Sequence, residues 1–172
     1  MIIVGIDPGS RITGFAALQR KPDGKMRVLE VSALKLNEKA PLPERLSTLA
    51  DALELRFSKF KPDCVAIEQV FFAKNAKSAL VLGHARGVVL LSAQRAGAKL
   101  IEFTPTEVKR LITGNGNANK EQVRKAVQLF GGPRSFDTHD ASDALALAMT
   151  QFFVSRPGGA LTPSPFQANV RR

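Results

Sequence analysis

The chain has 172 residues, enough for one domain with its own hydrophobic core. Its 44% hydrophobic and 23% charged residues exclude disorder of the whole chain, and its single cysteine excludes a scaffold held by internal disulfides. A net charge of +10 favours a polyanionic partner, with nucleic acid first. We find no signal peptide and no apolar stretch near the ~18 residues of a membrane span, so we expect a cytoplasmic protein.

Three strands joined by short turns are predicted at the start of the chain. Residues 1–6 are apolar on both faces, as in a buried central strand, and the sequence DPGS at 7–10 is typical of a turn. Residues 12–20 and 25–36 have strand character, and the turn KPDG separates them. Short connections of this kind indicate an antiparallel meander.

Helices and strands alternate in the rest of the predicted order. In sequence, we expect a helix ending near residue 60, a strand at 64–67, a helix at 75–95, a strand at 100–103, and helices beginning near 105, 119 and 138. A meander followed by such units predicts an α/β fold in which one mixed sheet has helices on both faces. Residues 1–155 are expected to form this domain, and 156–172, rich in Pro, Gly and Ser, a disordered basic tail.

Four acidic residues lie where burial disfavours a free carboxylate. Asp7 and Glu68 each follow a strand that is predicted to be buried, while Asp140 and Asp143 share one face of an apolar helix. If the first and fourth strands are neighbours, these acids converge at one end of the sheet. No Lys or Arg is adjacent in sequence to Asp7, Glu68 or Asp143, which favours a divalent cation over internal ion pairs. All-oxygen ligands suit Mg²⁺ or Mn²⁺, and two such ions support phosphodiester hydrolysis.

Each of these residues also has an ordinary structural role open to it. Asp7 is suited to opening the turn that follows it, and Glu68 to a solvated strand end. Asp140 is suited to the positive end of a helix dipole. His139 is typical of a surface histidine, and its position beside Asp140 makes it an alternative nitrogen ligand.

Three segments carry a resemblance to a known family: GIDPGSRITGFA from residue 5, IEQVFFAKNAKSALVLGHARGVVLL from residue 67, and HDASDALALA from residue 139. Through them the chain closely resembles the bacterial RuvC Holliday junction resolvases, from residue 1 to about 154. The resemblance implies a ribonuclease H-like fold and a homodimer that nicks two opposing strands of a four-way DNA junction in recombination and repair. It also implies two Mg²⁺ ions per active site, with Mn²⁺ as a substitute, and the RuvA–RuvB branch-migration complex as a partner.

The resemblance also assigns roles to individual positions. Those of the four catalytic carboxylates are filled here by Asp7, Glu68, Asp140 and Asp143, with His139 beside the third. Phe71 matches an aromatic residue used at the junction centre, and Lys109 and Lys120 match basic residues that contact DNA.

The residues themselves support part of these assignments. Phe71 and Phe72 point in opposite directions on a strand-like segment, so one can stack on bases while the other enters the core. Lys120 and Arg124 share a helix face, which is suited to solvent or, given the net charge, to phosphate contact.

Other functions remain open on sequence grounds. DPGS is also similar to the phosphate loop of actin-like ATPases and sugar kinases, although those proteins need two lobes. A DNA-binding module without catalysis would leave the four acids unexplained. A ribonuclease H-like nuclease that cuts RNA·DNA hybrids is the nearest alternative to a resolvase.

The 75–95 helix is the expected dimer contact. It carries small residues, Ala79, Gly83 and Gly87, at four-residue spacing. Such a ridge lets a second backbone approach closely, and the second backbone belongs either to another copy of the chain or to the sheet beneath the helix.

Overall fold

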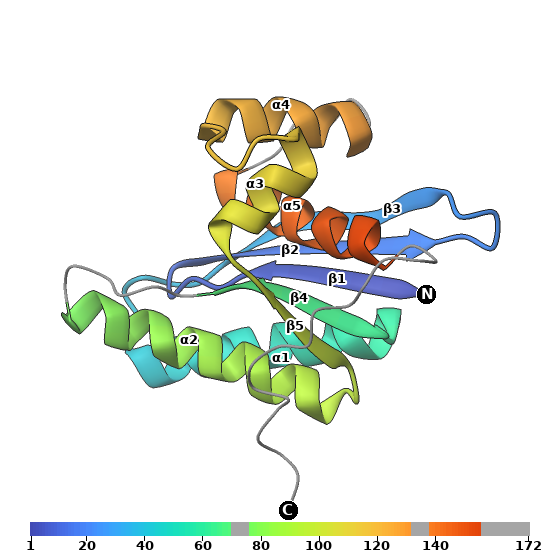
Figure 1. Ribbon diagram of the computed structural model, residues 1–172. Coiled ribbons are helices and arrows are strands. Elements are labelled where there is room, and N and C mark those ends of the chain that lie inside the picture. Colours follow the sequence, from blue (N-terminus) through green and yellow to red (C-terminus); the bar gives the residue numbers. More distant parts are fainter. Residues whose placement is uncertain (70–75, 132–137, 156–172) are drawn as a thin grey trace, which may run out of the picture.

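A computed structural model of the chain describes residues 1–69, 76–131 and 138–155. Its elements follow the predicted order, and each strand boundary lies within one residue of its prediction (Figure 1). In chain order they are β1 (Ile2–Asp7), β2 (Ile12–Arg20), β3 (Met26–Lys35), α1 (Leu42–Phe60), β4 (Cys64–Glu68), α2 (Ala76–Arg95), β5 (Lys99–Phe103), α3 (Pro105–Thr113), α4 (Lys120–Gly131) and α5 (His139–Val154). The predicted disordered tail at 156–172 lies outside the described residues and stays a prediction.

The five strands form one mixed sheet in the order β3-β2-β1-β4-β5. The β1–β2 and β2–β3 pairs are antiparallel, which confirms the meander, while β4 pairs in parallel with both β1 and β5. Ile6 of β1 pairs with Ile67 of β4. The next residues of these strands, Asp7 and Glu68, therefore lie at the same end of the sheet, as the sequence predicts for neighbouring strands.

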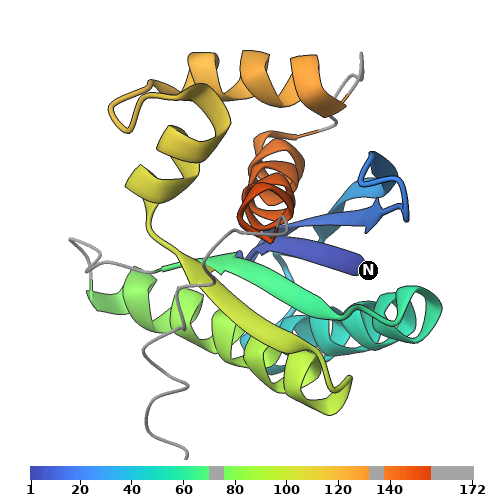
Figure 2. The same ribbon diagram turned by 45° about the vertical axis from the view of Figure 1, so that its right-hand side comes forward.

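Helices cover both faces of the sheet, as expected (Figures 1 and 2). On one face, α1 and α2 lie side by side and bury short apolar rows, Leu49, Leu53 and Phe57 from α1 and Ala85, Val89 and Ala93 from α2. On the other face lies α5, with α3 and α4 beyond it. Within the described ranges, no helix is long and apolar enough to cross a membrane.

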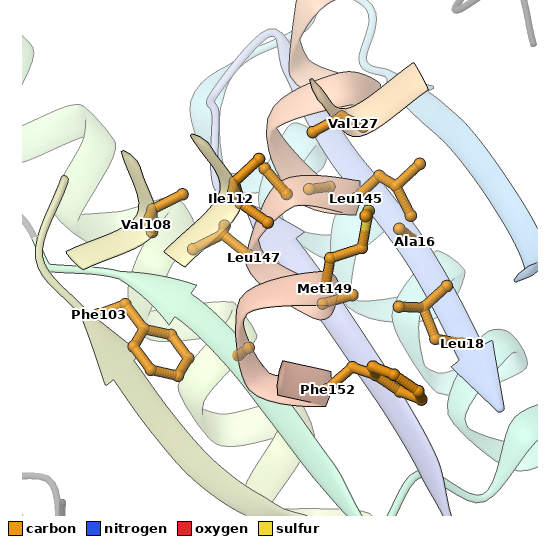
Figure 3. Close-up of a cluster of buried hydrophobic side chains, with 14 of the residues drawn as sticks. Ala16, Leu18, Phe103, Val108, Ile112, Val127, Leu145, Leu147, Met149 and Phe152 are labelled. Carbon is orange, nitrogen blue, oxygen red and sulfur yellow. The ribbon is translucent and has the colours of Figure 1, made fainter. Parts of the chain in front are cut away.

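α5 is enclosed on nearly all sides, and eleven of its 16 residues are buried. Leu145, Met149 and Phe152 belong to the same apolar cluster as Ala16 and Leu18 of the sheet (Figure 3). The cluster continues to α3 and α4 through Val108, Ile112 and Val127, which lie on the opposite side of α5 from the sheet (Figure 3). A helix held between the sheet and a second helical layer provides a fixed platform for the acids that it carries.

Side-chain caps fix where α3 and α4 begin. Thr104 Oγ1 accepts a hydrogen bond from the Glu107 N–H, and the Glu107 carboxylate accepts one from the Thr104 N–H, at 3.2 and 2.8 Å. Asn119 and Gln122 form the same reciprocal pair before α4, both at 2.9 Å. These capping boxes confirm the predicted helix starts and fix the first residue of α4, Lys120.

Cys64 and Phe130 differ in how far they are buried. Cys64 is buried, and burial raises the pKa of its thiol to about 12, as in a core residue rather than a reactive one. On α4, Val123 and Val127 are buried, whereas Phe130 is 51% exposed. The Phe130 ring instead lies edge-on to Phe153 of α5, with centroids 5.6 Å apart.

Candidate active site

Two of the predicted acids come from adjacent parallel strands. Asp7 ends β1 and Glu68 ends β4, and both side chains are half-buried. The turn after Asp7 is held by other groups. The Gly9 N–H donates to Thr13 Oγ1 at 3.2 Å, and Arg45 Nη1 donates to the Ser10 carbonyl at 2.8 Å. Because Thr13 takes the turn N–H that an Asp at position 7 commonly binds, opening the turn does not explain Asp7.

Two strand glycines bring α5 onto the sheet beside Asp7. A Cβ atom on Gly14 would lie 1.9 Å from the Asp140 carbonyl oxygen, and one on Gly5 would lie 2.0 Å from the Ala144 carbonyl oxygen. Gly14 is also the residue that pairs with Asp7 across β1 and β2. The first turns of α5 therefore touch the strand backbone where Asp7 ends β1. The close contacts of Gly5 and Gly14 with α5 were not predicted, although glycine inside a strand is a known signal of close backbone approach.

Asp143 faces outward from a helix in which most residues are buried. Its side chain is exposed, while its neighbours Ser142 and Ala144 are buried. Asp140, one turn earlier, is half-buried, and His139 is exposed at the first residue of the helix. The Thr138 hydroxyl caps this end by accepting a hydrogen bond from the Ala141 N–H at 3.2 Å.

A cavity of about 140 Å³ opens at this end of the sheet. Its polar lining consists of Asp7, Glu68, Asp143, Lys109 and Lys120. Apolar residues of α3, α4 and α5 complete the wall: Pro105, Val108, Val123, Ala146 and Leu147. The structure thus brings together three of the four predicted acids and both predicted lysines.

The other predicted site residues that the structure describes, Asp140, His139 and Arg124, are not part of the cavity lining. Asp140 nevertheless lies close enough for its charge to raise the pKa of Asp7 and of Asp143. Arg124 is exposed on α4, and Phe71 lies outside the described residues.

Burial and mutual repulsion make the three acids reluctant to ionise. Burial raises the pKa of Asp7 from its usual 3.8 to about 7, and the negative charges of the other three acids act in the same direction. Partial desolvation at the cavity also raises the pKa of Glu68, and the charge of Asp143 adds to this shift. The same cause raises the pKa of Asp143, although this residue is accessible from the cavity mouth, and the charge of Asp140 adds to it. Shifts of this kind in neighbouring carboxylates mark a site that lacks positive charge.

The two lysines supply part of that charge from elements distant in sequence. Lys120 lowers the pKa of all three cavity acids, and Lys109 lowers that of Glu68. No Lys or Arg is adjacent to these acids in sequence, but α3 and α4 bring the two lysines to the cavity through the fold.

The donor set of the cavity fits a hard divalent cation. All three acids offer oxygen ligands, and the raised pKa values mean that a cation would stabilise their ionised forms. In their present positions, no three Asp, Glu, His or Cys side chains of the described residues form a group that would hold one ion. Asp7, Glu68 and Asp143, which share the lining of one cavity, are the residues that would hold such an ion.

Comparisons with known proteins agree on one family. The family model for the crossover junction endodeoxyribonuclease RuvC matches residues 3–151. The chain is similar to the RuvC of Bdellovibrio bacteriovorus, at 39% identity over 89% of this chain and 90% of that protein. Its identity to the RuvC of Syntrophotalea carbinolica is 42%, over 87% and 92% of the two chains.

Solved structures agree with the sequence comparisons. The chain is similar to T. thermophilus RuvC in complex with a Holliday junction substrate, with a TM-score of 0.85 and 32% identity over 94% of this chain and 98% of that one. A yeast mitochondrial Holliday junction resolvase shares the fold, with a TM-score of 0.60 and 17% identity over 88% and 77% of the two chains.

Proposed function

Because the chain belongs to the RuvC family of crossover junction endodeoxyribonucleases, we propose that Asp7, Glu68, Asp140 and Asp143 are its catalytic residues. The protein is an endonuclease that resolves four-way DNA junctions in recombination and repair, and nucleases of this family are metal-dependent. One observation carries the site assignment. Carboxylates from three separate elements line a single cavity at the end of the sheet, opposite two lysines.

The four carboxylates would hold two Mg²⁺ ions, for which Mn²⁺ can substitute. Bound there, the ions supply positive charge that activates water and stabilises the phosphodiester transition state. At the third position we favour Asp140 over His139, because Asp140 is half-buried and its charge acts on Asp7, while His139 is exposed.

Lys109, Lys120 and Arg124 would contact the DNA backbone. Both lysines line the cavity, so each can reach a phosphate that lies at the carboxylates. Arg124 is exposed on α4, one turn after Lys120, and would extend this contact along the strand. Phe71 is proposed to stack on bases at the junction centre, on the strength of its match to the family.

The enzyme would act as a homodimer joined through the outer face of α2. Leu80 and Leu91 on this face are 64% and 52% exposed, and Gly83 and Gly87 lie between them. A Cβ atom on either glycine would meet nothing within 4 Å, so the ridge does not pack on its own sheet. An exposed apolar stripe with small residues at its centre suits a second copy of the same helix. Two equivalent opposing strands are matched most simply by a twofold pair of active sites.

Three further expectations rest on the family resemblance and the sequence. The RuvA–RuvB branch-migration complex would be a partner, and the enzyme would act in the cytoplasm. Residues 1–155 would form the nuclease domain, with 156–172 as a basic tail.

The test is a cleavage assay that compares three substrates. Wild-type protein is incubated with a labelled four-way junction, a linear duplex and an RNA·DNA hybrid, each with Mg²⁺ or EDTA, and the nicks are mapped. We expect paired, symmetric nicks in the junction with Mg²⁺ and none with EDTA. Faster cutting of the hybrid than of the junction would favour a ribonuclease H-type enzyme, and cutting in EDTA would contradict the metal site.

A further inference from the structure

Arg86 on α2 connects two strands at the end of the sheet that holds the proposed catalytic site. Its Nη1 donates a hydrogen bond to the carbonyl oxygen of Glu68 at 2.6 Å. Its Nη2 forms an ion pair with the carboxylate of Glu102 on β5. Both charged side chains are largely buried, with 14% of Arg86 and 4% of Glu102 exposed.

The contact falls on the residue that ends β4. Glu68 is its last residue and pairs with Phe103 of β5, after which the Gln69 N–H donates to the Phe103 carbonyl at 2.8 Å. Arg86 therefore binds the main chain of Glu68 from α2, while β5 binds the same stretch from the strand side. The Glu68 side chain, which lines the cavity, extends from a backbone held on both sides.

A buried ion pair between a helix and a sheet needs a specific reason, because apolar side chains could fill the same space. Removing two charges from water costs free energy, and an apolar pair of similar volume often packs at least as well. What an apolar pair cannot do is donate to a main-chain carbonyl. The planar guanidinium places one terminal nitrogen on Glu102 and the other on the Glu68 carbonyl, a division of donors that a lysine ammonium reproduces poorly.

We propose that Arg86, oriented by Glu102, is a positioning residue that sets the orientation of Glu68 for metal binding. The inference rests on the proposed function, in which Glu68 is a metal-binding carboxylate. Neither Arg86 nor Glu102 lines the cavity, so neither is proposed to touch the ion or the DNA. Partners that orient a metal ligand in this way commonly change metal affinity or activity by about 10- to 100-fold when they are removed.

The chain offers a matched control at a distance from the site. Arg56 of α1 donates to Glu30 of β3 at 3.0 Å and to the Ala52 carbonyl at 3.2 Å, and 21% of each charged side chain is exposed. Like Arg86, it pairs with a strand glutamate and donates to a main-chain carbonyl, although that carbonyl belongs to its own helix. Its contacts involve no residue of the cavity. Glu30 also pairs with Lys59 at 3.3 Å. Arg56→Gln should therefore show the effect of losing a helix–strand arginine–glutamate pair that has no contact with Glu68, while Glu30 keeps a second cation.

The experiment measures metal binding and cleavage on the same full-length variants, Arg86→Gln, Glu102→Gln and Arg56→Gln. Mn²⁺ affinity is determined without DNA by electron paramagnetic resonance, and single-turnover junction cleavage is followed over a range of Mg²⁺ concentrations. For Arg86→Gln and Glu102→Gln we expect Mn²⁺ binding about 10-fold weaker or more, and a matching rise in the Mg²⁺ concentration for half-maximal cleavage. Arg56→Gln should match the wild type in Mn²⁺ affinity and in the Mg²⁺ dependence of cleavage. In all three variants, junction affinity measured in Ca²⁺ should change by no more than about twofold.

Two outcomes would overturn the inference. One is a folded Arg86→Gln protein whose Mn²⁺ affinity and Mg²⁺ dependence equal those of Arg56→Gln. If Arg86→Gln does not fold, Arg86→Lys replaces it, because this variant keeps the charge beside Glu102. Wild-type metal affinity in a folded Arg86→Lys would then overturn the inference, and weakened affinity would support it.

The Glu68→Gln variant distinguishes failure of the proposed function from failure of the positioning role. If Glu68→Gln binds Mn²⁺ and cleaves as the wild type does, Glu68 is not a metal ligand and the site assignment itself is wrong. If Glu68→Gln is inactive and Arg86→Gln is normal, only the positioning role fails.

Discussion

The helices on the two faces of the sheet are buried to very different degrees. On one face, α5 buries eleven of its 16 residues and leaves Asp143 exposed at the cavity. On the other, α2 buries three of its 20 residues and exposes Leu80 and Leu91. A helix held on all sides can keep catalytic acids in place, whereas a helix held on one side has a surface available to a partner. This difference supports the proposals that catalysis takes place on the α5 face and dimerisation on the α2 face.

The largest expected effect comes from adding a methyl group on the α5 face. Gly14→Ala would place a Cβ 1.9 Å from the Asp140 carbonyl oxygen, between an interior strand of the sheet and the largely buried helix α5. We expect a loss of about 3 kcal/mol or more in the free energy of unfolding, measured by chemical denaturation. Gly87→Ala on α2 is the control. Within the described part of the single chain its new methyl group meets nothing within 4 Å, so a gain of about 1 kcal/mol in the stability of the monomer is expected from helix propensity. Equal effects at the two positions would contradict the comparison.

Bulk on the α2 face should change assembly and leave the fold intact. Gly83→Leu points into open space in the single chain, so the variant should keep a near-native circular dichroism spectrum. If the stripe is the dimer contact, the protein should sediment as a monomer, nick one junction strand at a time and lose paired cleavage. Gly83→Ala is the control, because alanine has a helix propensity similar to that of leucine but a much smaller side chain. This variant should disrupt the dimer less than Gly83→Leu does. A Gly83→Leu protein that remains dimeric would place the interface elsewhere.

The raised pKa of Asp7 predicts how stability depends on pH without metal. Because the pKa is 3.8 when unfolded and about 7 when folded, the folded chain holds a proton between these values that the unfolded chain releases. Stability should therefore fall as pH rises from about 4 to 7, by at most ~1.4 kcal/mol per pH unit from this group. Asp7→Asn should flatten the curve in EDTA, since its amide does not titrate. Mg²⁺ should oppose the fall, because it binds the ionised acid. An unchanged slope in Asp7→Asn would contradict the assignment of the pKa.

The smallest effects are expected from the lysines at the cavity. Lys109→Ala and Lys120→Ala should each weaken junction binding and reduce the slope of log K against log salt by roughly one unit. Lys125→Ala is the control, because Lys125 lies on the same helix as Lys120, pairs with Glu121 at 2.9 Å and does not line the cavity. Equal salt slopes in Lys120→Ala, Lys125→Ala and the wild type would return Lys120 to an ordinary surface role.

Much of the site could be predicted because it depends on strand ends. Each of Asp7 and Glu68 directly follows an apolar run, so the sequence locates both at strand ends. Their convergence was predicted on the condition that β1 and β4 are neighbours, and the structure meets this condition. Capping boxes before α3 and α4 are local patterns as well. The strand-end acids and the capping boxes each depend on only a few consecutive residues, so they can be recognised in the sequence.

The features that were missed depend on contacts between distant elements. Gly5 and Gly14 matter only because α5 crosses β1 and β2 at those two residues. The lysines reach the acids through the placement of α3 and α4, which sequence adjacency does not reveal. On α2, small and apolar residues occur on both the buried and the exposed sides, so periodicity alone could not decide which side faces the sheet.

The most direct test of the account is single-turnover cleavage of a four-way junction by Asp7→Asn, Glu68→Gln and Asp143→Asn, with junction affinity measured on the same samples in Ca²⁺. Each substitution removes a proposed metal ligand and no phosphate contact. We expect cleavage to slow by more than about 100-fold while affinity changes by no more than about twofold. A variant that cuts at the wild-type rate would remove its residue from the site, and wild-type rates in all three would contradict the carboxylate site altogether.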